Sequence, residues 1–187
     1  ADGRLKPNVS APGWVADFDD ASIHTVEGTS FASPLIAGLA ACIWEVWGDT
    51  TKPLTLLEHI EQAGHLYPYF DYAHGYGIPH AERFFSYRRP FACFKTELVS
   101  DYLIITPDSL LMQSISTPPL FYFHVQNKGG VLRTYGLIAP DSASPIIFTL
   151  KHDAHKQKKP DKYELFIQPG DIIRLHMNGY TEEIAVP

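Results

Sequence analysis

Three patterns of hydrophobic and polar residues follow one another along the chain. Residues 31–44 contain no charged side chain and many small ones, which is typical of a helix buried on nearly all sides. In the next segment Leu56, Leu57, Ile60 and Ala63 recur on one face, which predicts an amphipathic helix. From about residue 90 the apolar runs are short and are separated by Pro, Gly, Asn and Asp, so this part is predicted to be all β.

The β part also contains alternating patterns and turn signals. Residues 121–125 and 172–177 alternate in a way that suits sheets with one buried face, so we expect a β-sandwich. Residues 127–130 (Asn-Lys-Gly-Gly) predict a hairpin, and residues 168–171 (Gln-Pro-Gly-Asp) predict a turn. The expected strands are 93–99, 102–105, 120–126, 131–138, 146–150, 163–167, 172–177 and 183–186.

Local signals place further elements in the first half of the chain. Thr55 and Glu58 have capping-box spacing, and Gly64 can occupy the left-handed position after the amphipathic helix. Residues 5–11 and 23–26 are expected to be extended, with an acidic loop between them.

Aromatic residues are concentrated in 66–72, and 74–79 follow directly. We expect an irregular surface segment that ends in a packed turn. Aromatic side chains mostly contribute buried area, so cover for a core is favoured over a site that stacks a ligand.

Charge and length exclude two classes of partner. The net charge of -6 at pH 7 disfavours nucleic acid, and the one dense basic run, 151–159, is expected to be a solvated loop. A membrane span needs about 20 apolar residues, so 31–44 is too short, and Pro34 and Glu45 bracket it. No nucleic-acid partner and no membrane span are expected.

The possible metal ligands and thiols give no site. Asp17, Asp19 and Asp20 lack the full spacing of a calcium motif, and His152 and His155 have no accompanying Cys or second pair of ligands. We therefore assign no metal ligand. The two cysteines, Cys42 and Cys93, are expected to be free and buried.

Residues 28–34 place a serine where a tight turn becomes a small-residue helix. A hydroxyl at this position lies beside unpaired backbone N–H groups and the positive end of the helix dipole. These features can stabilise the oxyanion that forms when the hydroxyl attacks a carbonyl group. Ser30 is therefore a candidate nucleophile, and a purely structural role for it stays open.

Two linked motifs resemble those of the subtilisin-like serine proteases. They are Lys6-Pro7-Asn8-Val9-Ser10-Ala11-Pro12-Gly13 and Gly28-Thr29-Ser30-Phe31-Ala32-Ser33-Pro34. Gly75-Tyr76-Gly77-Ile78-Pro79 is similar to the segment that closes the catalytic domain, so the resemblance covers 1–85. It implies that Ser30 is the catalytic nucleophile and that the backbone of Ser30, supported by Thr29, donates to the oxyanion.

The chain departs from this family in one important respect. Family members have Asp, His and Ser in that order, and neither the Asp motif nor the His motif precedes Ser30 here. The amide side chain that completes the oxyanion hole is also upstream in the family. We therefore expect the chain to be the C-terminal part of a larger protease, and to be inactive by itself.

The resulting fold-class prediction is α/β, the C-terminal portion of a subtilisin-like parallel-sheet domain, followed by an all-β sandwich. The domains are predicted as 1–89, the peptidase portion, and 90–187, an accessory domain. Without its upstream half the first domain would expose an apolar helix, so a rearranged or self-associated form is expected. The resemblance further implies a polypeptide substrate, the upstream domain portion as a partner and a secreted or cell-surface location. It implies no cofactor in this chain, with calcium possible in the intact protease.

Two other functions stay open. One is a non-catalytic interaction module, in which a degenerate protease domain carries the sandwich. The other is an α/β-hydrolase, in which the acid and base follow the serine and Asp71 would act with His74 or His80.

Overall fold

A computed structural model describes residues 6–19, 22–48, 52–84, 91–114, 119–140, 144–152 and 163–187. The chain forms two compact units, one within Leu5–Arg88 and the other comprising Arg89–Pro187 together with 1–4. The assignment of 1–89 and 90–187 as a peptidase portion and an accessory domain stays a prediction.

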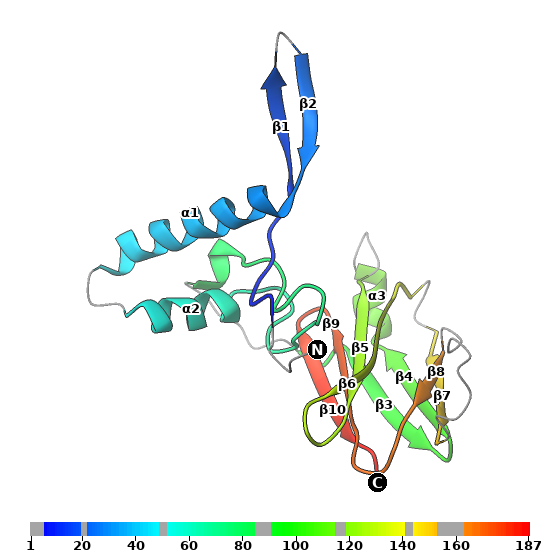
Figure 1. The fold of residues 1–187 in the computed structure, drawn as a ribbon. Helices are drawn as coiled ribbons and strands as arrows, with labels where there is room; N and C mark the ends of the chain where they lie inside the picture. The colour runs from blue at the N-terminus through cyan, green and yellow to red at the C-terminus, as the bar shows by residue number, and fades with distance from the viewer. Residues whose placement is uncertain are drawn as a thin grey trace. The chain divides into compact units, whose positions relative to one another are not determined.

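The first unit begins with an antiparallel hairpin and continues with two helices (Figure 1). Strands β1 (Trp14–Asp19) and β2 (Ser22–Glu27) pair from Trp14 opposite Glu27 to Asp19 opposite Ser22. Helices α1 (Thr29–Trp47) and α2 (Pro53–Gln62) follow, and a short 3₁₀ helix, η1 (Ala81–Phe84), comes last. Within the described residues, this hairpin is the sheet of the first unit, and the parallel sheet of the expected fold class is not present there.

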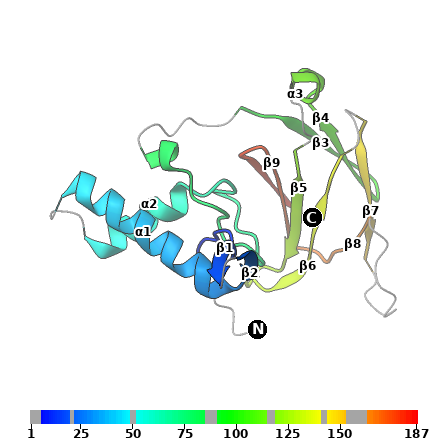
Figure 2. The same cartoon turned by 90° about the horizontal axis from the view of Figure 1, so that it is seen from above.

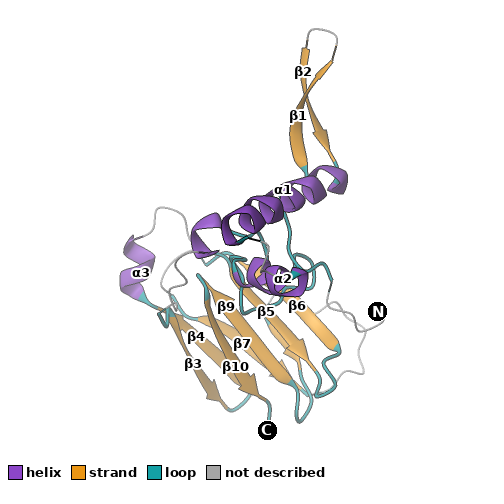
Figure 3. Ribbon diagram, turned by 90° about the vertical axis from the view of Figure 1, so that its left-hand side faces the viewer, coloured by secondary structure: helices purple, strands orange, loops and turns teal. Residues whose placement is uncertain are grey.

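A small core holds the two helices of the first unit together. Ile43 of α1 packs against Leu56 and Ile60 of α2, and Trp47 lies edge-on to His59 with 4.6 Å between ring centroids. The two helices lie side by side in Figure 3. The predicted amphipathic helix is therefore present with Leu56 and Ile60 buried, whereas Leu57, which was expected on the same face, is exposed.

The expected burial of α1 is wrong. Among its described side chains only Ile43 is buried, while Leu35, Trp44 and Val46 are exposed. The absence of charged residues predicts an apolar helix surface, but it does not show whether other elements cover that surface. The expectation that the first unit exposes an apolar helix is met.

The length argument against a membrane span is also wrong, because α1 has 19 residues instead of covering only 31–44. By length and composition α1 could cross a membrane. The core helix of a soluble protein meets the same criteria, so the length of α1 does not decide between these two settings.

Three local predictions in the first unit need correction. The expected acidic loop contains β1, which runs to Asp19. Helix α2 begins two residues before Thr55, because Pro53 occupies its first position, and no side chain caps it. Gly64 is not left-handed. It is required for another reason, since a Cβ there would lie 2.1 Å from the Tyr76 carbonyl oxygen.

The aromatic segment 66–72 is more buried than expected. Leu66, Tyr69 and Phe70 are buried, and the Phe70 ring meets the Tyr76 ring edge-on at 5.2 Å. The segment is irregular, as predicted, and its apolar side chains contribute a packed interior to the first unit.

The second unit contains two four-stranded sheets, which Figure 2 shows as separate layers. One sheet has the order β10-β9-β5-β6 and is antiparallel throughout. The other has the order β3-β4-β7-β8, in which β7 and β8 are parallel. The strands are β3 (Phe94–Val99), β4 (Tyr102–Pro107), β5 (Phe121–Gln126), β6 (Leu132–Ile138), β7 (Ile146–Lys151), β8 (Glu164–Phe166), β9 (Ile172–Met177) and β10 (Tyr180–Ala185). A short helix, α3 (Ser109–Ser114), was not expected from the sequence.

One hydrophobic core joins the inner faces of the two sheets. Phe123 of β5 contacts Phe148 of β7 at 4.8 Å between ring centroids, and Phe94 of β3 contacts Phe121 of β5 at 5.5 Å. The sheets thus pack face to face, which is the arrangement that the alternating pattern predicts.

The two predicted turns of the second unit are present. The Asn127 side-chain oxygen accepts hydrogen bonds from the Gly129 and Val131 backbone N–H groups, both at 2.9 Å. In the other turn the Asp171 N–H donates to the Gln168 carbonyl at 3.0 Å.

Gly136 is expected to be sensitive to substitution. A Cβ at this position would lie 2.5 Å from Cζ of Phe123, and the Phe148 ring limits the movement of that side chain. Gly136→Ala should therefore destabilise the second unit by about 1–3 kcal/mol. Hydrogen exchange of the Leu175 amide in β9 would measure this loss. Leu137→Ala, at an exposed neighbouring position, is the control, and an equal effect of both changes would contradict the packing argument.

Candidate functional site

Ser30 is the second residue of α1 and is exposed. Gly28 is the N-cap residue, and no side chain caps the helix. The N–H groups of the first helical turn have no intrahelical acceptors, although the Phe31 N–H donates to the Gly28 carbonyl at 3.1 Å. Ser30 therefore presents its hydroxyl beside backbone donors and the positive end of the α1 dipole.

Pro34 lies inside the helix, although the sequence pattern placed it at the boundary of the apolar run. It is the sixth residue of α1 and not part of the first turn. Because proline has no N–H, Pro34 cannot donate the usual intrahelical hydrogen bond to the Ser30 carbonyl. The start of α1 thus has one backbone hydrogen bond fewer than a helix without proline.

Three segments that carry the sequence motifs converge in the first unit. The Gly28 N–H donates to the Gly13 carbonyl at 2.7 Å, which closes the base of the β1–β2 hairpin directly before Ser30. The Ser10 N–H donates to the Gly77 carbonyl at 3.0 Å. The segment 6–13 therefore connects the turn around residue 77 with the start of α1.

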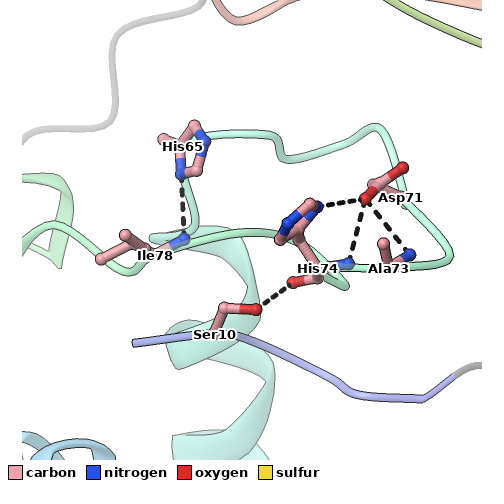
Figure 4. Close-up of polar contacts among 6 residues, drawn as sticks. All are labelled: Ser10, His65, Asp71, Ala73, His74 and Ile78. Carbon is pink, nitrogen blue, oxygen red and sulfur yellow. Dashed lines mark hydrogen bonds and ion pairs between the residues drawn. The ribbon is translucent and has the colours of Figure 1, made fainter. Parts of the chain in front are cut away.

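The Ser10 side chain strengthens this connection. Its hydroxyl donates to the His74 carbonyl at 2.8 Å, and the Tyr76 N–H donates to the Asn8 carbonyl at 2.8 Å. Figure 4 shows Ser10 beneath the His74 carbonyl. No local sequence pattern indicates this role of Ser10, which depends on a partner 64 residues away.

Asp71 and His74 form a close pair in the same turn. Oδ2 of the buried Asp71 lies 2.6 Å from Nδ1 of the exposed His74, and it also accepts hydrogen bonds from the Ala73 and His74 backbone N–H groups (Figure 4). The carboxylate thus organises its own turn. Within the described residues no hydrogen bond or ion pair joins Ser30 to Asp71, His74 or His80, so the α/β-hydrolase arrangement gains no support.

His65 is a half-buried titratable group that the sequence pattern did not single out. Its Nδ1 accepts a hydrogen bond from the Ile78 N–H at 2.9 Å, and its ring lies 6.3 Å from the His80 ring. Partial burial, the largest cause, lowers the pKa of His65 below its usual 6.5; the contact with the Ile78 backbone opposes this shift, and the neighbouring charges of His80 and Arg83 add to it.

The other candidate residues are dispersed. Asp17 and Asp19 lie on β1, whereas Asp20, His155 and most of the basic run 151–159 lie outside the described residues. Among the residues that the structure describes, no group of three or more His, Cys, Asp or Glu is placed to hold a metal ion.

The two cysteines are free and differ in exposure. Cys42 is exposed on α1, so its expected burial is wrong, because α1 itself is exposed. Cys93 is buried, and burial raises the pKa of its thiol to about 11. Its Sγ donates to the Met177 carbonyl at 3.0 Å, which makes it an inert core residue.

Comparison with known families identifies the first part of the chain. Residues 1–77 match the model of the subtilase family. The match relates this segment to the subtilases. The match ends within the Gly75–Pro79 motif and contains Ser30, so the subtilase segment is somewhat shorter than the predicted 1–85. Comparison with curated proteins and with solved structures found no match.

Proposed function

We propose that this chain is the C-terminal part of a subtilisin-like serine endopeptidase, in which Ser30 forms the acyl-enzyme. The subtilase match over 1–77 is the observation that carries this proposal. The position of Ser30 supports it, because the residue is exposed at the start of a helix and beside backbone donors.

The proposed reaction is acyl transfer. The Ser30 hydroxyl attacks the carbonyl carbon of a peptide bond, a histidine encoded upstream accepts the hydroxyl proton, and an upstream aspartate orients that histidine. The Ser30 backbone N–H, supported by Thr29, donates to the oxyanion. Collapse of the tetrahedral intermediate releases the amine, which takes the proton back, and water then hydrolyses the acyl-enzyme.

The exposed face of α1 supports the need for an upstream partner. The helix carries exposed Leu35, Trp44 and Val46, and β1 adds exposed Trp14 and Phe18. Soluble monomers rarely expose large contiguous apolar patches. We propose that the upstream portion of the protease domain covers α1, and that the isolated chain self-associates instead.

The remaining features of the proposal follow from the family. We place the intact protein outside the cell or at its surface, with polypeptides as substrates. No cofactor is assigned to the described residues of this chain, and any calcium site of the intact protease is assigned to its upstream part.

The purified chain is expected to hydrolyse no protein substrate, because it lacks the proposed general base. Casein hydrolysis by the chain and by its Ser30→Ala variant would test this expectation. Activity of the chain that disappears in Ser30→Ala would show that the base lies within these 187 residues. An intact upstream sequence without Asp and His motifs would instead favour the non-catalytic interaction module.

A further inference from the structure

Between two antiparallel segments, the His65 side chain takes the place of a backbone carbonyl as the hydrogen-bond acceptor. The His65 N–H donates to the Ile78 carbonyl at 3.1 Å, and the Leu66 N–H donates to the Tyr76 carbonyl at 3.1 Å. The Ile78 N–H is directed at the His65 ring and donates to Nδ1 at 2.9 Å (Figure 4). Ile78 is thus held by the backbone of His65 on one side and by its imidazole on the other.

The His65 ring fits closely against its surroundings. Gly77 has φ 77°, and a Cβ at that position would lie 2.4 Å from Cε1 of His65. The ring therefore occupies the space beside the 76–78 backbone that any larger residue at position 77 would need. This packing fixes Nδ1 opposite the Ile78 N–H.

The charged groups around His65 oppose its protonation. His80 lies beside the ring, Arg83 of η1 donates to the Gly64 carbonyl at 2.7 Å, and His74 also contributes positive charge when it is protonated. Asp71, the carboxylate of this turn, is engaged by His74. These neighbours therefore disfavour positive charge on a ring nitrogen that must stay unprotonated to accept its hydrogen bond.

We propose that His65 is an acid-sensitive latch that closes the 63–66 and 76–80 segments at neutral pH and releases them when Nδ1 is protonated. Protonated Nδ1 becomes a donor that faces the Ile78 N–H, so the hydrogen bond is lost. Opening should also loosen residues 8–10, because the Tyr76 N–H donates to the Asn8 carbonyl and the Ser10 N–H donates to the Gly77 carbonyl.

The sign of the pH dependence follows from the lowered pKa of His65. The ring takes up its proton more readily when the latch is open, so the closed state is fully favoured above about pH 6.5. The preference for the closed state is lost as the pH falls below 6.5 and then through the pKa of His65 in the closed state, which is lower. The inference concerns the packing of this chain and does not depend on the protease proposal.

Hydrogen exchange of the full chain tests the latch. After correction for intrinsic exchange, protection of the Ile78 amide should fall at least about tenfold between about pH 7.5 and about pH 5, with parallel losses at Ser10 and Tyr76. The Leu175 amide in the second unit should stay protected. His65→Asn should abolish the acid effect, because its amide oxygen can accept from Ile78 without titrating.

Matched variants distinguish His65 from its neighbours. His80→Asn and His74→Asn should retain the acid loss at Ile78. The proposal is wrong if wild-type protection is equal at both pH values, if His65→Asn keeps the acid loss, or if His80→Asn removes it. Should His65→Asn fail to fold, NMR titration of the wild-type ring decides, because a His65 pKa at or above 6.5 would also overturn the latch.

Discussion

Ser30→Ala in the intact protein is expected to lower kcat/KM for peptide hydrolysis by at least about 10⁴-fold. Alanine removes the only atom that can form the acyl-enzyme in the proposed reaction, while the start of α1 keeps its backbone. Substrate binding should change little, because the hydroxyl acts mainly in the transition state. Steady-state kinetics on a peptide substrate would measure the loss.

Ser33→Ala provides the matched control for this change. Ser33 is exposed one turn after Ser30 on the same helix, and the proposed reaction gives it no role. Its activity should stay close to that of the unmodified protein. Equal losses in the two variants would indicate damage to α1 and would contradict the assignment of Ser30 as nucleophile.

Gly75→Ala is expected to destabilise the first unit by about 3 kcal/mol or more. Gly75 has φ 64°, and a Cβ there would lie 2.3 Å from the Pro7 carbonyl oxygen and 2.4 Å from that of Asn8. Both atoms belong to the backbone and cannot move without loss of the hydrogen bonds of 6–13. The change should therefore displace residues 6–13, which lead to the start of α1, from the turn around residue 75.

Gly48→Ala distinguishes the close contact from backbone strain. Gly48 also has a positive φ, 76°, but a Cβ there would meet no atom within 4 Å. It should cost only about 1 kcal/mol, the strain of a left-handed residue. All three tryptophans lie in the first unit, at 14, 44 and 47, so tryptophan fluorescence during denaturant unfolding reports on it. Similar losses in both variants would contradict the close-contact argument.

The strands of the second unit could be predicted because their signals are local. Alternation and turn residues placed β9 at 172–177, where the structure has it. The parallel pairing of β8 with β7 could not be predicted, because alternation and turn residues indicate where a strand lies but not its direction relative to its neighbour. Helix α3 was missed although Asp108 precedes it, and the Asp108 side chain accepts from the Leu110 N–H at 2.9 Å.

The first unit was harder to predict because its packing depends on distant partners. The charge-free pattern of 31–44 predicted a helix but could not show what covers it. Similarly, Thr55 and Glu58 matched a capping pattern, yet Pro53 starts α2 earlier because its fixed φ suits the first helical position.

The candidate site was predictable to the extent that its motifs are contiguous. Ser30 is found by its local sequence, and that motif lies within the subtilase match. Ser10 and His65 were not found, because their roles depend on contacts with His74 and Ile78 that no local pattern records.

The most direct test of the proposed function is identification of the residue that a fluorophosphonate modifies in the intact protein. The account predicts one adduct on Ser30, found by mass spectrometry of the peptide that contains 28–34, and no adduct in Ser30→Ala. Efficient modification of a different residue, with Ser30 unmodified, would contradict the assignment of this chain as the nucleophile-bearing part of a serine protease.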